Sequence, residues 1–276
     1  MSQVQYFLTS DEAKLNWYSW TSKTPSRACN IYIHNSFTHC MEGSYLAEEL
    51  ANNGIITYAF NLRGWNMENS EYPEFSGWER DIEDIANFIQ FVQTLHPDLP
   101  LILSGHGTGA LQSLLYLSTN QNIIKIALIS SPWISMKISF PGSLKLSKTI
   151  FPNKSFEAPF TLEILTHDND ILETYYQDKE KGFRNHNFTA KWYGDLQKQQ
   201  DLIKETAANI TTPVIMLHGG QDLIIDDTES QKVFDQLQSN PKKWEYYPRF
   251  YHDVWNEDKR EESHNHCIQF INSILN

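Results

Sequence analysis

Three short stretches of the sequence carry side chains suited to acyl-transfer chemistry. The apolar run "LILS" (101–104) is followed by "GHGTG" (105–109), and two later runs are followed by Asp222 and His252. In such a constellation the carboxylate orients the imidazole, and the imidazole takes the proton of an attacking side chain. The glycine-rich stretch fits Gly-x-Ser-x-Gly at every position except the third, which is Gly107. The pattern therefore predicts an acid and a base beside a vacant nucleophile position.

Other hydroxyl groups near Gly107 are weaker candidates for the nucleophile. Ser104 lies on the expected strand, where burial in the sheet is the simpler interpretation, and Thr108 begins the expected helix, so its side chain would have to turn back. Ser36 follows the first expected strand, and we expect its backbone to matter more than its hydroxyl. Activation of water by the imidazole and carboxylate alone would be chemically feasible but slow.

The same glycines allow a second interpretation, a phosphate-binding loop. Gly105, Gly107 and Ala110 approximate Gly-x-Gly-x-x-Gly/Ala between a strand and a helix, as in a dinucleotide site. That fingerprint also needs an acidic residue at the end of the next strand, and the next expected strand ends "ALISSPW" without one. The acyl-transfer interpretation is favoured, and no cofactor is expected.

Alternating strands and helices are predicted to position these residues. We expect strands over 28–34, 55–61, 101–104, 122–130, 212–219 and 243–248, and helices over 44–54, 78–95, 108–118, 226–239 and 258–275. Strands separated by helices of this length predict the α/β class, with a mostly parallel central sheet flanked by helices. In such a sheet, ligands bind at the carboxyl ends of the strands, which is where the three stretches fall.

The alternation breaks between residues 131 and 205. This block is rich in Lys, Phe, Pro and Asn and has no clear strands. We predict that 131–205 forms a cap inserted into a core made of 1–130 and 206–276. Some aromatic side chains of the block are expected to line an acyl-chain tunnel or a lid, and others to form the cap's own core.

Composition and charge limit the classes of partner. The chain has 276 residues and a net charge of −12, which argues against nucleic acid and disfavours an anionic membrane surface. No apolar run approaches the ~18 residues of a membrane span, and the N-terminus does not resemble a signal peptide, so a cytoplasmic location is expected. The three cysteines are widely spaced and predict neither a disulfide framework nor a zinc site. The oligomeric state is left open.

Histidine-rich and acidic stretches outside these motifs predict structural roles and no metal site. His34 and His39 are expected to form structural hydrogen bonds. The stretch "THDND" (166–170) is expected to cap a helix, because the remaining ligand spacing of a calcium loop is missing. The stretch "HNHC" (264–267) is expected on a solvated face of the last helix.

Taken together, the motifs resemble the monoacylglycerol lipase/lysophospholipase branch of the α/β-hydrolases, also called serine aminopeptidase-like. "SGHGTGA" is similar to the family's "GHSxGG", and "TPVIMLHGGQDLIID" and "YYPRFYHDVWNE" resemble its acid and base segments. "IYIHNSFTHCMEGSYLAEELANNGIITYAFNLRGWNMENS" (31–70) is similar to its HG turn, helix, strand and "RGHGxS" loop. The likeness covers roughly residues 27–275.

The resemblance implies an α/β-hydrolase fold with a helical cap and hydrolysis of a carboxylic ester through an acyl-enzyme. The implied substrates are acyl esters such as monoacylglycerols or lysophospholipids. Asp222 would orient His252, which would be the base, and the backbone N–H groups of Ser36 and Thr108 would hold the oxyanion. The strand-to-helix turn around the nucleophile, the elbow, would be completed by Gly105, His106 and Gly109.

The departures from the family pattern leave two histories open. Gly107 stands where the family has serine, Asn35 replaces the glycine of the HG turn, and Asn61 replaces an aspartate. Glycine at the elbow relieves backbone strain of about 1–3 kcal/mol but removes the attacking atom. The chain is therefore expected to be inactive as it stands. It is either a hydrolase inactivated by substitution or a natural pseudoenzyme that binds an acyl ligand or a protein partner.

Overall fold

The computed structural model describes residues 5–65, 74–120 and 122–275. The end of the predicted "RGHGxS"-like loop, from residue 66 on, lies outside them. Within these ranges one eight-stranded sheet has the order β1-β2-β4-β3-β5-β6-β9-β10. The strands are Gln5–Leu8 (β1), Lys14–Trp20 (β2), Ala28–Ile33 (β3), Ile55–Phe60 (β4), Leu101–His106 (β5), Ile124–Ser130 (β6), Val214–Gly219 (β9) and Lys242–Tyr247 (β10).

The six strands from β4 through β3 to β10 pair in parallel, and β1 and β2 add an antiparallel edge. The predicted α/β class with a mostly parallel sheet is therefore confirmed. The sequence patterns missed β1 and β2. β1 has only four residues, three of them exposed, so it carries little of the apolar periodicity that marks a strand.

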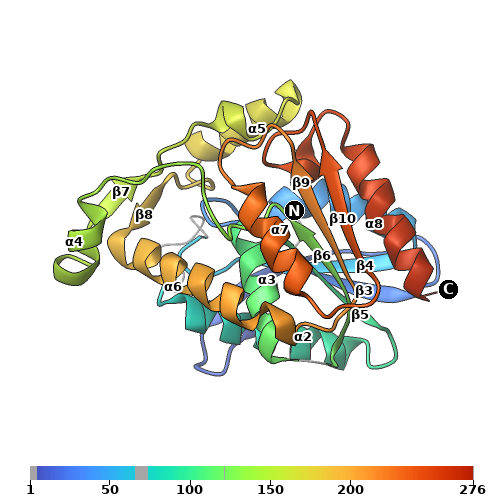
Figure 1. Cartoon of the computed structure of the whole chain (residues 1–276). Coiled ribbons are helices and arrows are strands. Elements are labelled where there is room, and N and C mark those ends of the chain that lie inside the picture. Colours follow the sequence, from blue (N-terminus) through green and yellow to red (C-terminus); the bar gives the residue numbers. More distant parts are fainter. Residues whose placement is uncertain (1–4, 66–73, 121, 276) are drawn as a thin grey trace.

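Helices cover both faces of the sheet (Figure 1). They are Ser44–Asn52 (α1), Trp78–Leu95 (α2), Thr108–Thr119 (α3), Asp227–Gln236 (α7) and Arg260–Leu275 (α8). Leu46 and Leu50 of α1 share one buried apolar cluster with Ile271 of α8, whereas α2 and α3 contribute to a second cluster. The sheet therefore has a hydrophobic core on each side. No helix of the described ranges is both long and apolar enough to cross a membrane.

The segment between β6 and β9 does not continue the alternation of sheet strands and helices. It contains Leu144–Ile150 (α4), Ser155–Glu157 (β7), Asn169–Glu180 (α5), Asn187–Thr189 (β8) and Ala190–Thr206 (α6). The expectation of no strands here was wrong, because β7 and β8 form a two-stranded antiparallel sheet. Each has three residues, too few to give a readable alternation. Short 3-10 helices cover Cys40–Gly43, Leu162–Ile164, Ala207–Asn209 and Val254–Asn256. We keep 131–205 as the proposed extent of the cap.

Candidate active site

The glycine-rich stretch forms a tight turn between β5 and α3. Gly107 lies at the turn with φ +59° and ψ −120°, a conformation that side chains with a Cβ rarely adopt. Its N–H donates to the Ser130 carbonyl at 3.0 Å, and its carbonyl accepts from the N–H of Leu111 and of Trp133, each at 3.2 Å. A Cβ on Gly109 would collide with backbone carbonyls of β3 and the residue after it, so glycine is needed there for close packing. The turn has the shape of the predicted elbow.

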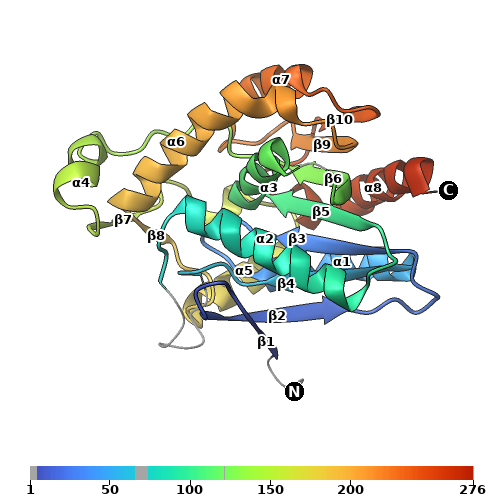
Figure 2. The ribbon, with the colours of Figure 1, turned by 90° about the horizontal axis from the view of Figure 1, so that it is seen from below.

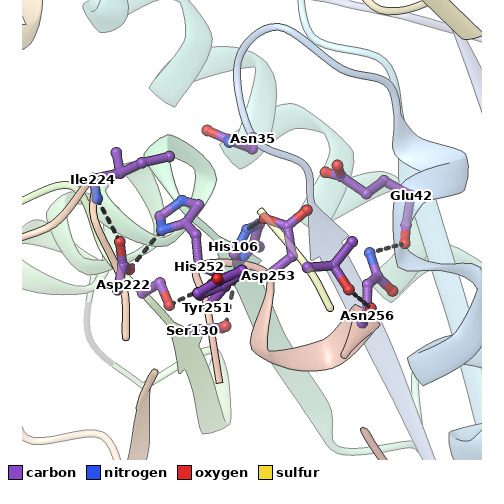
Figure 3. Close-up of polar contacts among 12 residues, drawn as sticks. Asn35, Glu42, His106, Ser130, Asp222, Ile224, Tyr251, His252, Asp253 and Asn256 are labelled. Carbon is purple, nitrogen blue, oxygen red and sulfur yellow. Dashed lines mark hydrogen bonds and ion pairs between the residues drawn. The ribbon is translucent and has the colours of Figure 1, made fainter. Parts of the chain in front are cut away.

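Asp222 and His252 meet beside this turn, as Figure 3 shows. His252 Nδ1 lies 2.7 Å from Asp222 Oδ2, and both side chains are buried. The other carboxylate oxygen accepts the N–H groups of Ile224 (2.7 Å) and Ile225 (3.0 Å), which fixes its orientation. Burial disfavours the cationic form of His252, but the Asp222 carboxylate outweighs this and raises the pKa of the imidazole. The structure thus brings the predicted acid and base into a hydrogen-bonded pair.

The second nitrogen of His252 is occupied by Trp133. The indole N–H donates to His252 Nε2 at 3.0 Å, and Trp133 is fully buried just after β6. Because Nε2 accepts a hydrogen bond, the proton of the neutral ring is on Nδ1, where it faces Asp222. In the triad mechanism Nε2 takes the proton of the nucleophile. Here Nε2 accepts a hydrogen bond from the Trp133 indole instead.

Asn35 fills the space in which a nucleophile and an oxyanion would lie. Its Oδ1 accepts the N–H of Thr108 at 3.0 Å and lies 3.0 Å from the Thr108 hydroxyl. The Ser36 N–H donates to the same hydroxyl at 2.6 Å. A Cβ built on Gly107 would lie 2.5 Å from Asn35 Oδ1 and 2.6 Å from Cγ. The N–H groups predicted to hold an oxyanion are therefore both engaged within the protein.

A second histidine–aspartate pair lies behind the first and was not predicted. His106 Nε2 lies 2.8 Å from Asp253 Oδ1, and its Nδ1 lies 3.1 Å from the Ser130 hydroxyl. Tyr175 donates its hydroxyl proton to Asp253 Oδ2 at 2.6 Å. Burial opposes ionisation of Asp253, but the hydrogen-bonded His106, together with His252 and Arg184, outweighs it and lowers the pKa of Asp253. The one signal in the sequence was the acidic residue directly after His252.

His106, His252 and Asp253 also lie close enough together to hold a metal ion. Each donor atom of these side chains nevertheless has a hydrogen-bond partner within the protein. The rings of His106 and His252 have centroids 4.9 Å apart, and the Trp133 indole donates to Nε2 of His252. Hydrogen bonds to every donor atom are what a structural network requires.

Aromatic side chains close the space above the elbow. Phe37 is buried, and its ring centroid lies 5.0 Å from that of Trp192, 5.1 Å from that of Trp65 and 5.8 Å from that of Phe160. Trp192 of α6 also donates its indole proton to the Ser36 hydroxyl at 3.3 Å. Of the two roles expected for the cap aromatics, Phe160 and Trp192 fill that of core packing, because they pack against Phe37.

The remaining histidine and acidic stretches have mostly structural partners. His34 accepts the Leu62 N–H at 2.9 Å, and Asp168 caps α5 by accepting the N–H groups of Asp170 and Ile171. Both roles were expected. His264 departs from the expectation of a solvated helix face. It is buried, with Nε2 3.0 Å from the Trp255 carbonyl.

The chain matches the family described as "Serine aminopeptidase, S33" over residues 24–259. An uncharacterized abhydrolase domain-containing protein of Dictyostelium discoideum is 26% identical over 98% of the chain, which spans only 29% of that protein's length. A phospholipase of Bacillus subtilis is 22% identical over 89% of the chain and 95% of its own length. A soluble variant of monoglyceride lipase from Saccharomyces cerevisiae has a similar structure, with a TM-score of 0.86 at 20% identity, covering 98% of this chain and 95% of that one. The likeness in structure confirms the predicted fold.

Proposed function

Because the chain belongs to the serine aminopeptidase S33 family of α/β-hydrolases, in its monoacylglycerol lipase-like branch, we propose that it is a non-hydrolytic member built on an ester-hydrolase scaffold. The ancestral reaction would be cleavage of a carboxylic ester, such as a monoacylglycerol or lysophospholipid, through an acyl-enzyme. The present chain would use the retained scaffold to bind an acyl ligand or a protein partner.

The fit between Asn35 and Gly107 carries this proposal. Ester cleavage needs an attacking atom, donors for the oxyanion and a base that takes the proton. Gly107 has no attacking atom, and Asn35 fills the space that a Cβ at this position would need. The same Asn35 oxygen engages the Thr108 N–H. Loss of a nucleophile costs about a millionfold in turnover in a comparable site, and loss of one oxyanion donor about 10²–10³-fold.

A hydrolase inactivated only at position 107 is the second candidate. The Asp222–His252 pair favours it, because the hydrogen bond of 2.7 Å and the tautomer are those that a working base requires. Exchange of the nucleophile alone, however, leaves the rest of the site as it was. In this chain the HG-turn residue is also changed, and its side chain fits against Gly107. The two matched changes, at positions 35 and 107, favour a natural pseudoenzyme. We call this arrangement, in which Asn35 fills the nucleophile position, the closed site.

Turnover of p-nitrophenyl esters tests the proposal. We expect the unchanged chain and His252→Ala to release p-nitrophenol from the acetate, butyrate and octanoate esters at equal rates. Trp133→Phe, which frees His252 Nε2 from the indole N–H, is a second comparison. We expect it to release p-nitrophenol at the same rate as His252→Ala. A rate for the unchanged chain that exceeds that of His252→Ala several-fold would show that the imidazole still activates water or another hydroxyl, and the proposal would be wrong.

We also propose the cytoplasm as the location of the chain. The three cysteines are buried, and they form no disulfide in the described part of the chain, which suits a reducing compartment.

A further inference from the structure

The first strand, β1, leaves one edge of the central sheet open. β1 is the terminal strand, and in the described part of the chain only β2 pairs with it. Figure 2 shows β1 beside β2 at the border of the sheet. An open edge presents a row of free N–H and C=O groups to another strand. Tyr6 and Leu8, two residues apart on β1, are 51% and 64% exposed, so large side chains accompany these groups.

The hydrogen bonds between β1 and β2 fix which backbone groups are free. The Thr9 N–H donates to the Ala13 carbonyl at 3.0 Å, and the same register continues along β1. Opposite residues of antiparallel strands alternate between hydrogen-bonded and non-hydrogen-bonded pairs. Phe7 therefore bonds to β2, whereas the backbone groups of Tyr6 and Leu8 point outward.

β1 lacks the charges that protect an edge strand. Residues 1–10 contain no Asp, Glu, Lys or Arg, although such residues make up 20% of the chain. β10, at the other edge of the sheet, carries Lys242, Lys243 and Glu245, and Lys243 Nζ lies 2.6 Å from Glu245 Oε1. Charged side chains on an edge strand oppose its pairing with another chain. Of the two edges, β1 is therefore the one suited to pairing.

The chemistry of this edge fits a second copy of the same chain. The chain carries a net charge of −12, so a basic partner would be drawn to its acidic surfaces and not to an uncharged strand. A second copy presents an equally uncharged edge. A two-fold axis through the sheet at Phe7 brings the outward groups of both copies into antiparallel register. Tyr6 of each copy then lies opposite Leu8 of the other copy.

We propose that two copies of the chain associate through β1, so that their sheets join into one. The pairing satisfies the outward N–H and C=O groups of Tyr6 and Leu8 and brings these side chains together across the axis. The interface is small, so we expect a dissociation constant on the order of 100 µM. The proposal uses no residue of the Asp222–His252 site and is independent of the proposed function.

Sedimentation equilibrium at chain concentrations from about 5 to 500 µM tests the association. The unchanged chain is expected to shift from monomer toward dimer over this range. Tyr6→Lys/Leu8→Lys places like charges opposite each other in both cross-strand pairs, and we expect it to raise the dissociation constant about 25-fold, at about fivefold for each pair. In Tyr6→Lys/Leu8→Glu the same pairs carry opposite charges. At low salt this variant should dimerise within about threefold of the unchanged chain.

Two further variants separate β1 from other surfaces. Leu95→Lys/Tyr246→Lys, the matched control, adds the same charges to exposed side chains on α2 and β10 and should dimerise as the unchanged chain does. Leu8→Pro removes an outward N–H but no bond to β2, and we expect it to weaken the dimer about tenfold or more. Circular dichroism and thermal unfolding of the lysine and glutamate variants should match those of the unchanged chain, since the altered side chains are exposed.

Three results would overturn the proposal. The first is an unchanged chain that stays monomeric at about 500 µM. The second is a dimer that Tyr6→Lys/Leu8→Lys forms as strongly as the control, because another surface would then join the copies. The third is a folded Tyr6→Lys/Leu8→Glu that stays monomeric, because Tyr6 would then not face Leu8 of the other copy.

Discussion

Substitution of Gly107 by alanine tests the fit at the elbow without any assay of activity. An alanine at φ +59° is strained by about 1–3 kcal/mol, whatever surrounds it. Its Cβ would also lie 2.6 Å from Asn35 Cγ, far inside the 3.5–4.0 Å at which carbon atoms attract each other. Forcing Asn35 away adds about 1–3 kcal/mol for overpacking. We therefore expect Gly107→Ala to lower the free energy of unfolding by about 2–6 kcal/mol in total.

Asn35→Gly should remove the collision but not the backbone strain. In that background Gly107→Ala is expected to cost only about 1–3 kcal/mol, so the two substitutions couple by about 1–3 kcal/mol. Urea unfolding followed by tryptophan fluorescence gives the four free energies of the cycle, provided that the denaturant dependence is the same in all four. Asn53→Gly at the end of α1 is the control partner and should combine additively with Gly107→Ala. Coupling below about 0.5 kcal/mol between positions 35 and 107 would refute the reasoning.

Three further predictions concern the rest of the fold. Buried histidines should make the chain acid-sensitive, because burial holds their folded pKa values below the ordinary 6.5. These are about 3 for His34 and His218 and about 4 for His264. Their neutral forms contribute stability that is fully present above pH 6.5 and is lost as the pH falls toward these values, by up to about 1.4 kcal/mol per pH unit for each. The raised pKa of His252 has the opposite effect, because its contribution to the free energy of unfolding is lost only as the pH rises above 6.5. Equal urea midpoints at pH 7 and pH 5 would contradict this. Arg184→Met should cost about 3–5 kcal/mol, because the buried Glu42, 2.5 Å from the guanidinium, loses its counter-charge; adding Glu42→Gln should recover part of the unfolding free energy, and no recovery would argue against a charge effect. Burial raises the pKa of Cys29 and of Cys267 to about 12, so Ellman's reagent should find neither thiol in the folded chain and all three cysteines after unfolding.

The parts of the fold that could be predicted are those with a local signal. α2 was expected over 78–95 and spans Trp78–Leu95, because its apolar side chains recur at helical spacing over five turns. β2 was missed because it is defined by pairing with β4, from Trp17 opposite Phe60 to Trp20 opposite Thr57. A pairing between segments some forty residues apart leaves no mark in either segment alone.

The site residues also fall into those that a local signal predicts and those that only the fold brings together. Asp222 and His252 could be placed because each follows a strand of a parallel sheet, and the carboxyl ends of such strands meet. Asn35 was noted as a departure from the family pattern, but its contact with Gly107 joins two loops and depends on a side-chain rotamer. The His106–Asp253 pair spans 147 positions of the chain, and only the fold brings these residues together.

The most direct test of the closed site is labelling of a restored serine by a fluorophosphonate, which reacts with activated serines. Intact mass spectrometry would compare Gly107→Ser with Asn35→Gly/Gly107→Ser, and with the double variant that also carries His252→Ala. The account predicts no adduct on Gly107→Ser, one adduct on the double variant and none once His252 is removed. Labelling of Gly107→Ser as rapid as that of the double variant would contradict it, because the chain would then be an intact hydrolase that lacks only its nucleophile.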